Sequence, residues 1–346
     1  MKKITQLMII SLFFYSTVKS QDIIMDYLIA TSDELKNDTE KLIEGYFSPL
    51  GGWYGTGLNS GWYNTGKPHQ FPGFDITFGI HFIKPPESAA SFTPNVDNLF
   101  GSSNGAPISE LPTFIGDGTN VPIFYQDPGG QLVELFQAPG GGNIRTDDVW
   151  PMPYLQGSIG LIKKTEILFR FTPKIDVEEL TMRYWGIGIK HDIKQWVPGI
   201  SELPFDLSFV GGYSNLNSSL ELDQDGQELI FDVKAFNSNI VLSKKLSVFT
   251  PYLGVGYQYA KSFLDLKGDY VILDWNGNEI IEGEDFTVSD PFSFSFGGVN
   301  GFKATTGARL KLFLFTIHVE YTMAEYNTFT FGIGLNSDIG SKLIGD

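Results

Sequence analysis

The chain has 346 residues, no cysteine and a formal net charge of −16, and it is rich in Phe (29), Tyr (15) and Gly (39). This acidic balance excludes nucleic acid as a partner, because nucleic-acid binding requires a basic face. The absence of cysteine excludes a disulfide-stapled scaffold and a lipoprotein.

The first twenty residues have the pattern of a secretory signal peptide. Two lysines give a positive start, and residues 7–15 form an apolar run that is shorter than the roughly 20 residues of a membrane helix. Val18 and Ser20 supply the side chains expected at a cleavage site. We therefore expect Sec-type export and cleavage between Ser20 and Gln21, which removes three lysines and no acidic residue.

A helix is expected after the signal peptide, followed by a loop. Thr31 and Glu34 have the spacing of a capping box. Residues 48–73 are rich in Gly, Pro, Asn and aromatic residues, which predicts a loop. We assign residues 21–73 to an N-terminal helix and plug segment. Four apolar residues share one face of the predicted helix: Leu35, Leu42, Ile43 and Tyr46.

From residue 74 onward, apolar residues recur at every second position. A soluble β-sandwich would show the same alternation. Here the strands are long, and their polar side often carries Gly, Thr, Lys or Glu, which favours a transmembrane β-barrel with its apolar side chains facing lipid. The clearest segments are residues 74–82, 205–213, 253–260, 315–321 and 329–335.

The predicted fold is an all-β membrane protein, an antiparallel barrel over residues 74–335. A strand at 74–83, an even number of strands between 84 and 153, and nine strands after 153 give about 12, with 10 or 14 as alternatives. Val121–Gln126 and Gln131–Phe136 are the two candidates in the middle region. The nine later strands are predicted at 154–162, 166–172, 180–191, 204–215, 228–242, 247–260, 301–311, 315–323 and 327–335.

The connections between these strands predict the orientation of the barrel. Short turns near Lys164, Lys244 and Phe313 alternate with longer polar loops, the longest at 261–300. Outer-membrane barrels have short turns in the periplasm and long loops outside, so residues 336–346 are expected to form a periplasmic tail. Five tyrosines are expected at the membrane interfaces: Tyr252, Tyr257, Tyr259, Tyr321 and Tyr326.

The chain resembles a family of uncharacterised outer-membrane proteins of Bacteroidota-type bacteria. The resemblance covers nearly the whole mature chain and implies an outer-membrane location without implying a function. It rests on three stretches: YFSPLGGWYGTGLNSGWYNTGKPHQFPGFDITF (46–78), GIGIKHDIKQWVPGISELPFDLSFVGGYSNL (186–216) and FTIHVEYTMAEYNTFTFGIG (315–334).

More distantly, the layout is similar to that of the long-chain fatty-acid transporter superfamily. Those barrels have N-terminal helices threaded into the lumen and an Asn-Pro-Ala motif before the first strand. Residues 63–66 (YNTG) stand at that position without the Pro and Ala, so no substrate residues are transferred. A lumen of 12 strands is too wide for its own side chains to fill, which also favours a plug.

The stretch LNSGWYNTGKPH (58–69) lies where this plug would meet the first strand. Its glycines and asparagines suit a turn, and its aromatic residues suit packing inside the lumen. We predict a hinge or latch there, with no catalytic role. The predicted latch residues are Trp62, Tyr63, Asn64, Lys67 and His69.

Polar residues on the later strands are candidates for the lumen lining. Thr316, His318 and Glu320 alternate on one strand and form either a polar path or, as we favour, a network that braces the plug. Lys303 and Arg309 either attract anionic groups or pair with acidic residues of the plug. The four histidines do not pair at metal-ligand spacing, so neither a metal nor a cofactor is predicted.

No G-x-S-x-G motif or cysteine nucleophile is present, so no enzyme activity is predicted. Two other functions are compatible with the sequence. The first function is a plugged channel or transporter for a small, hydrophobic ligand, with outer-membrane lipid around it. The alternative is a non-transporting scaffold for an envelope protein partner. A transporter needs a continuous cavity from loops to lumen, whereas a scaffold has a filled lumen and an exposed apolar patch.

Overall fold

The computed structural model describes residues 35–118, 120–127, 129–141, 145–177, 179–222, 226–275 and 280–337. The predicted signal peptide, the capping box at Thr31 and Glu34, and residues 338–346 of the predicted tail lie outside these ranges. Asn336 and Ser337, which were assigned to the tail, are the last residues of a strand.

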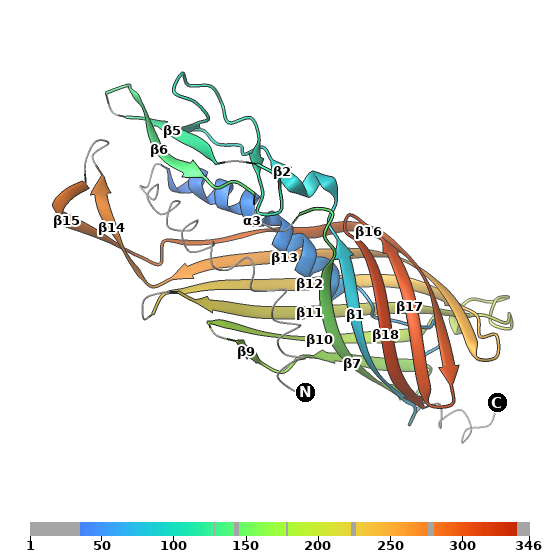
Figure 1. Ribbon diagram of the computed structural model, residues 1–346. Coiled ribbons are helices and arrows are strands. Elements are labelled where there is room, and N and C mark those ends of the chain that lie inside the picture. The colour runs from blue at the N-terminus through green and yellow to red at the C-terminus, as the bar shows by residue number, and fades with distance from the viewer. Residues whose placement is uncertain are drawn as a thin grey trace.

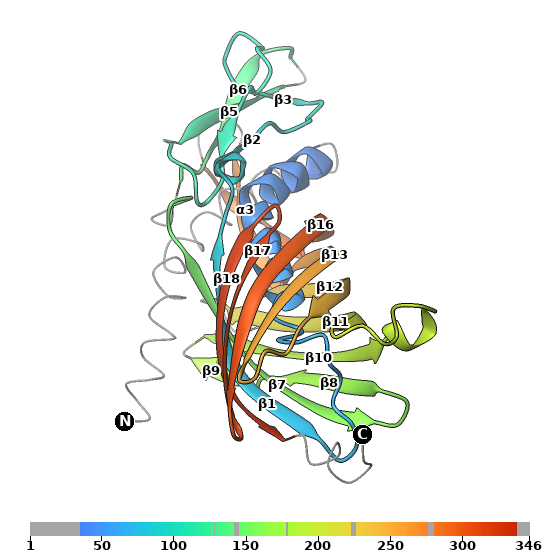
Figure 2. The same ribbon diagram turned by 90° about the vertical axis from the view of Figure 1, so that its right-hand side faces the viewer.

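Within the described residues, ten antiparallel strands close into a barrel (Figures 1 and 2). They pair in the order β11-β12-β13-β16-β17-β18-β1-β7-β8-β10, and pairing of β10 with β11 completes the ring. The short β9 (Ile175–Val177) pairs with the end of β10 only. The ten strands are β1 (Phe74–Lys84), β7 (Trp150–Leu161), β8 (Thr165–Phe171), β10 (Leu180–Asp192), β11 (Asp206–Glu221), β12 (Glu228–Ser243), β13 (Phe249–Lys267), β16 (Phe292–Leu312), β17 (Phe315–Met323) and β18 (Asn327–Ser337).

The antiparallel barrel is therefore confirmed, but the preferred count of twelve strands is wrong. The two middle strands form outside the ring, where β5 and β6 pair with each other and β5 pairs with β3. Both are shorter than the roughly 9–11 residues that span a bilayer. Residues 85–149 form this separate unit, the cap module. Its elements are η1 (Glu87–Ala90), β2 (Ser91–Phe92), β3 (Leu99–Phe100), β4 (Leu111–Pro112), β5 (Val121–Gln126) and β6 (Leu132–Ala138).

The two ends of the barrel differ. At one end, the tight-turn end, short connections join β7 to β8, β12 to β13 and β16 to β17, and η2 (Lys194–Trp196) lies between β10 and β11. Lys163, Lys164 and Phe313 adopt the left-handed conformation that such turns need. The opposite end, the cap end, carries the cap module (Figure 2).

The helix α3 (Lys36–Asn59) runs from the cap module into the barrel (Figure 1). Its predicted apolar face is confirmed, because all four residues named for it are buried. The predicted loop from residue 48 is wrong, since the helix continues through Pro49 and four glycines to Asn59. No helix in the described part of the chain is long and apolar enough to cross a membrane.

Close packing explains the continuation of α3. Glycine inside a helix costs about 1 kcal/mol relative to alanine, so local propensity disfavours this stretch. A Cβ atom on Gly55 would lie 2.6 Å from the Cβ of Ala260, and one on Gly52 would lie 2.1 Å from the ring of Tyr326. The glycines therefore let the helix approach the barrel wall more closely than any other residue would permit.

The polarity of the strands reverses along their length. In the lower part of β13, Val255 faces outward and is 61% exposed, while Gln258 is buried inside. Beyond Tyr259 the pattern inverts: Lys261 lies on the outer side, and Leu264 is buried against the core that includes α3. The pairing of β13 with β16 shifts register at the same place. The strands thus leave a membrane-type pattern and enter a conventional hydrophobic core.

Two predictions about this region are wrong. The loop predicted at 261–300 is mostly strand, because β13 and β16 continue upward and β14 (Asp269–Trp275) pairs with β15 (Ile280–Ser289) beyond them. Two of the five interface tyrosines are buried: Tyr252 faces the lumen, and Tyr326 packs over α3. The other three are exposed on the outer surface.

Candidate functional site

Residues 60–70, here called the lumen segment, leave the end of α3 and descend through the barrel to the tight-turn end. At the upper end, the side-chain amide of Asn59, the last residue of α3, donates to the Tyr259 carbonyl at 3.1 Å. The lower contact is a bridge from Gln70 to Leu161, the last residue of β7. Trp62 is fully buried, and of the predicted latch residues only Lys67 is exposed. The lumen segment therefore fills the polar part of the lumen.

Trp62 lies at the centre of this filling. Its indole N–H donates to the Leu58 carbonyl at 2.9 Å. The ring rests on glycines of two neighbouring strands, where a Cβ on Gly188 or Gly212 would come within 2.5 or 2.7 Å of it. The Arg170 guanidinium lies 4.2 Å from the ring centroid. Trp62 is thus held between a glycine surface and a buried cation.

Two cations from the wall meet the C-terminal end of α3. Lys303 Nζ donates to the Asn59 carbonyl at 2.6 Å, and Arg170 Nη1 donates to the Leu58 carbonyl at 3.3 Å. The last carbonyls of a helix lack intrahelical partners and carry partial negative charge, so cations stabilise them. Lys303 was predicted to line the lumen, but its partner is a backbone oxygen and not an acidic plug residue.

The other predicted lumen residues are also buried on the inner side. Arg309 Nη1 donates to Asn64 Oδ1 at 3.0 Å. Glu320 accepts a hydrogen bond from the Tyr252 hydroxyl at 3.0 Å, and the His318 ring lies 3.3 Å from the Tyr154 hydroxyl.

Thr316, on the same row, has a buried hydroxyl with no hydrogen-bond partner among the described residues. The row Thr316, His318 and Glu320 therefore does not form a continuous hydrogen-bonded relay. Each of its members faces the lumen, and two of them contact tyrosines from other strands.

A buried ion cluster fixes the lower end of the lumen segment. Glu166 Oε2 accepts from the His69 backbone N–H at 2.9 Å and lies 3.1 Å from both His69 Nδ1 and Lys190 Nζ. All three side chains are buried. A buried carboxylate is stable only when it is paired and hydrogen-bonded in this way. Removing one partner is expected to loosen the segment from the wall.

Sequence reasoning missed Arg170, Glu166, Lys190 and Tyr154, and it assigned Tyr252 to the membrane interface. The sequence carried one signal for them, because β8 reads TEILFRF and places Glu166 and Arg170 on the same side of a strand. Charged residues on the inner side of a membrane strand are costly unless they have partners. The identity of those partners depends on which strands become neighbours.

The upper half of α3 is anchored in the cap module. Asp38 is buried and accepts the backbone N–H groups of Asp97 and Asn98 at 2.9 and 2.7 Å. The Phe114 N–H donates to the Tyr46 carbonyl at 3.3 Å. Burial raises the pKa of Tyr46 to about 12, so its hydroxyl stays neutral. The helix is therefore fixed at its upper end by buried hydrogen bonds to the cap module.

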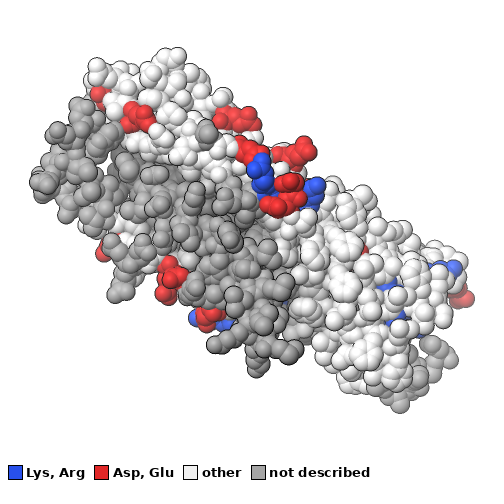
Figure 3. All heavy atoms as spheres, in the orientation of Figure 1, with Lys and Arg blue, Asp and Glu red and all other residues white. Residues whose placement is uncertain are grey.

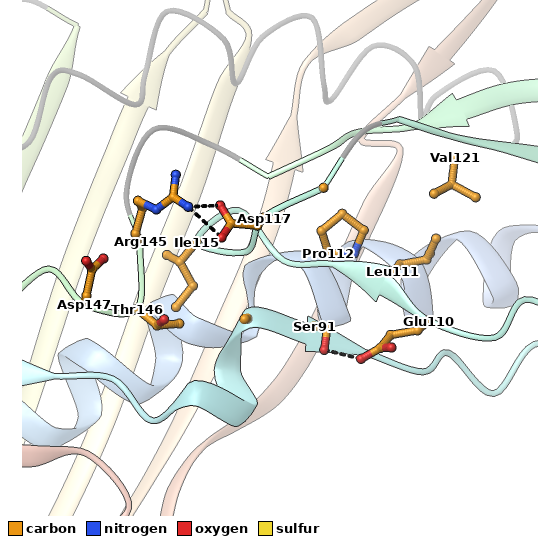
Figure 4. Close-up of a pocket in the computed structure, with 12 residues that line it drawn as sticks. Ser91, Glu110, Leu111, Pro112, Ile115, Asp117, Val121, Arg145, Thr146 and Asp147 are labelled. Carbon is orange, nitrogen blue, oxygen red and sulfur yellow. Dashed lines mark hydrogen bonds and ion pairs between the residues drawn. The ribbon is translucent and has the colours of Figure 1, made fainter.

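A second candidate site lies in the cap module, outside the lumen. A cavity of 610 Å³ has an apolar floor that includes Leu111 and Ile115 (Figure 4). At its rim, Arg145 pairs with Asp117 at 2.5 Å, and the Ser91 hydroxyl donates to Glu110 at 2.5 Å. The polar rim and apolar floor could hold a small ligand that has both kinds of surface.

Comparisons with known proteins give a family and distant structural likenesses. A family model described as "Family of unknown function (DUF6588)" matches residues 1–337. No curated protein matches the chain. The translocator domain of autotransporter NalP from Neisseria meningitidis shows 9% identity over 85% of this chain and 96% of its own, with a TM-score of 0.31.

Two other solved structures are similar at the same level. The toluene transporter TodX of Pseudomonas putida shows 7% identity over 77% of this chain and 89% of its own, with a TM-score of 0.24. The outer membrane channel DcaP of Acinetobacter baumannii shows 9% identity over 77% and 96%, with a TM-score of 0.18. These TM-scores are too low to establish a shared fold.

Proposed function

The chain belongs to this family of unknown function, and we propose that it is an outer-membrane β-barrel whose lumen is closed by an N-terminal plug. The observation that carries the proposal is that the lower part of the ten-stranded wall has apolar side chains on its outer surface and polar side chains inside. Phe78 is 52% exposed, whereas its neighbour Thr77 is buried. Exposed apolar and buried polar residues alternate in the same way along β17 and β18. Water disfavours such a surface, and lipid is the solvent that suits it.

The borders of the apolar surface support this location. The barrel face visible in Figure 3 is largely free of charged residues between the tight-turn end and the cap module. Outward aromatic residues lie near its upper border, where Tyr257 contacts Phe302 and Trp185 contacts Tyr213. Aromatic girdles of this kind mark membrane interfaces. Because outer-membrane barrels have their short turns in the periplasm, we propose that the tight-turn end lies there and that the cap module lies outside the cell.

We propose that the lumen segment is the gate and that α3 is its fixed support. The segment meets the wall through hydrogen bonds and ion pairs, which water can replace when the segment moves, and through an apolar cluster around Trp62 and Tyr63. The upper half of α3 instead packs in an apolar core. Because the lumen lining is polar and charged, a small hydrophilic solute suits this path better than the hydrophobic ligand predicted from the sequence.

A second candidate function is a non-transporting barrel that displays the cap module. The filled lumen and the cavity at Arg145 and Asp117 favour this alternative. In that case the ligand, or an envelope protein partner, would bind at the cap module, and the lumen would stay closed.

A reversible disulfide distinguishes the two functions. The Thr65 and Ser243 hydroxyl oxygens lie 3.2 Å apart, so the double substitution Thr65→Cys with Ser243→Cys brings two thiols close to bonding distance. The chain has no other cysteine. Uptake of a small sugar into liposomes is measured before and after reduction, with each single-cysteine variant as a control.

A gated channel shows uptake in the reduced protein that falls to the level of empty liposomes after oxidation. Equal uptake in both states would show that this segment is not the gate. No uptake in either state, in protein that is correctly inserted, would favour the display function.

A further inference from the structure

A small cationic cavity lies at the tight-turn end, between the lumen segment and the wall. It has a volume of 90 Å³, and its lining includes four cationic side chains and one acidic side chain. Lys67 comes from the lumen segment, Arg309 and Lys311 come from β16, Lys245 comes from the turn before β13, and Asp206 begins β11. Such an excess of positive charge is unexpected in a chain with a net charge of −16.

Arg309 is the buried member of this group. It is only 6% exposed, and its Nε atom is buried with no acceptor among the described residues. Its one hydrogen bond joins Nη1 to Asn64 Oδ1, and no carboxylate in the described chain lies within ion-pair distance of it. A buried guanidinium without a counter-charge is costly. Arg309 therefore has room and free N–H capacity for an anion from outside the protein.

The remaining charged residues of the cavity lining complete a site for an anion. Lys67 and Lys245 are exposed at the opening, and neither forms an ion pair with a described residue. Asp206 is the single acidic residue in the lining, and its carboxylate accepts a hydrogen bond from the Ser243 hydroxyl at 3.4 Å. Lys311 donates to Asn336. The net charge of the cavity lining remains positive after Asp206 is counted.

We propose that this cavity binds a small oxyanion, a carboxylate or phosphate group, between Arg309 and Lys245 of the wall and Lys67 of the lumen segment. A guanidinium presents N–H groups in the planar arrangement that oxyanions accept, and lysines add point charges. A volume of 90 Å³ admits one such group and excludes a nucleotide. Because the anion contacts both the segment and the wall, its binding holds the segment in the closed position.

This inference goes beyond the proposed function, because binding is measured on the closed protein and needs no transport. Full-length protein in phosphatidylcholine nanodiscs is titrated at low salt with inorganic phosphate and with acetate, by calorimetry. The variants are Lys67→Gln, Lys245→Gln and Arg309→Gln. Lys244→Gln is the matched control, because it removes an exposed lysine next to Lys245 that does not line the cavity.

The expected result is anion binding that weakens about tenfold or more in each cavity variant and stays unchanged in Lys244→Gln. A second arm identifies the source of the anion. If a lipid headgroup occupies the site, phosphatidylglycerol nanodiscs raise the unfolding temperature of the wild type, and Lys67→Gln, which changes an exposed side chain, loses this shift.

The proposal is overturned if neither anion binds and phosphatidylglycerol has no effect. It is equally overturned if Lys244→Gln weakens binding as much as Lys245→Gln, because a general surface charge would then explain the result. Sugar uptake by the cysteine-locked protein is a separate measurement, so a failure of the gate and a failure of the anion site are told apart.

Discussion

The buried cluster of Glu166, Lys190 and His69 decides how firmly the lower part of the plug is held. Glu166 Oε2 lies 3.1 Å from both Lys190 Nζ and His69 Nδ1, and the three residues come from two strands and the lumen segment. An ion pair of this kind adds little when complete, because desolvation offsets the attraction, but the loss of one partner leaves a charge buried alone. Replacing only one residue of the Glu166–Lys190 pair should therefore lower the free energy of unfolding more than replacing both together.

The substitution Glu166→Gln is expected to lower the free energy of unfolding by about 3–5 kcal/mol, because Lys190 loses its counter-charge. The measurement is urea unfolding in lipid vesicles. The double variant Glu166→Gln with Lys190→Met should lose clearly less than the sum of the two single variants. Glu134→Gln, at an exposed position of the cap module, serves as the control. Additive losses would show that the pair is not coupled.

Alternation along a strand predicts the side that a residue faces but not its partner. Thr316, His318 and Glu320 were expected to line the lumen, and all three side chains are buried at alternate positions of β17. Their contacts with Tyr154 and Tyr252 depend on strands that are far away in the sequence. The sequence alone therefore indicates a polar lumen, and the pairing of strands in the closed ring determines which polar groups meet.

The helix α3 shows how packing overrides local propensity at the scale of an element. Its second half contains Gly51, Gly52, Gly55 and Gly57, which is why the sequence predicted a loop from residue 48. Gly51 and Gly55 pack against β13 and β16, whereas a Cβ atom on Gly52 would meet Tyr326 and one on Gly57 would meet Met152 of β7. A propensity argument counts their cost and has no means of counting the contacts that they permit.

The substitution Gly55→Ala tests this explanation. Alanine favours a helix, yet its Cβ would lie 2.6 Å from that of Ala260, so we expect a loss of about 1–3 kcal/mol from overpacking. Ala260→Gly removes the opposing methyl group and should restore part of the loss in the double variant. Unfolding in vesicles measures both. A stabilised Gly55→Ala protein would mean that the helix does not press against the wall.

The strands were predicted better than the helix, except toward the cap end of the barrel. All nine strands expected after residue 153 are present among the described residues. The sequence predicts a loop for the upper parts of β13 and β16 because their outward residues are polar, such as Lys261 and Asp265 on β13 and Ser293 on β16. Alternation persists there with reversed polarity, and a pattern fitted to lipid-facing strands does not detect this reversal.

At the scale of the molecule, the chain passes through its own barrel before it forms the first strand. The helix α3 contacts the cap module at one end, and the lumen segment reaches the tight-turn end at the other. The sequence predicted a plug, and the ten-stranded ring explains how so short a segment fills the lumen, since a ring of ten strands is narrower than one of twelve.

The proposed orientation predicts which surfaces are accessible on cells. Ser103→Cys places a thiol on the cap module, and Lys244→Cys places one at the tight-turn end, both at exposed positions in a chain without cysteine. A membrane-impermeant maleimide should label the first variant in intact cells and the second only after the outer membrane is permeabilised. The opposite pattern would mean that the barrel is inserted the other way round.

The most direct test of closure by the lumen segment is ion conductance across planar bilayers. Trp62 and Tyr63 are buried in the lumen, where Trp62 rests on strand glycines and Tyr63 packs beside Tyr252. The double substitution Trp62→Ala with Tyr63→Ala removes both rings and should open a leak, whereas the wild type should show no steady conductance. A wild type that conducts as an open pore, or a correctly inserted double variant that stays silent, would contradict the account.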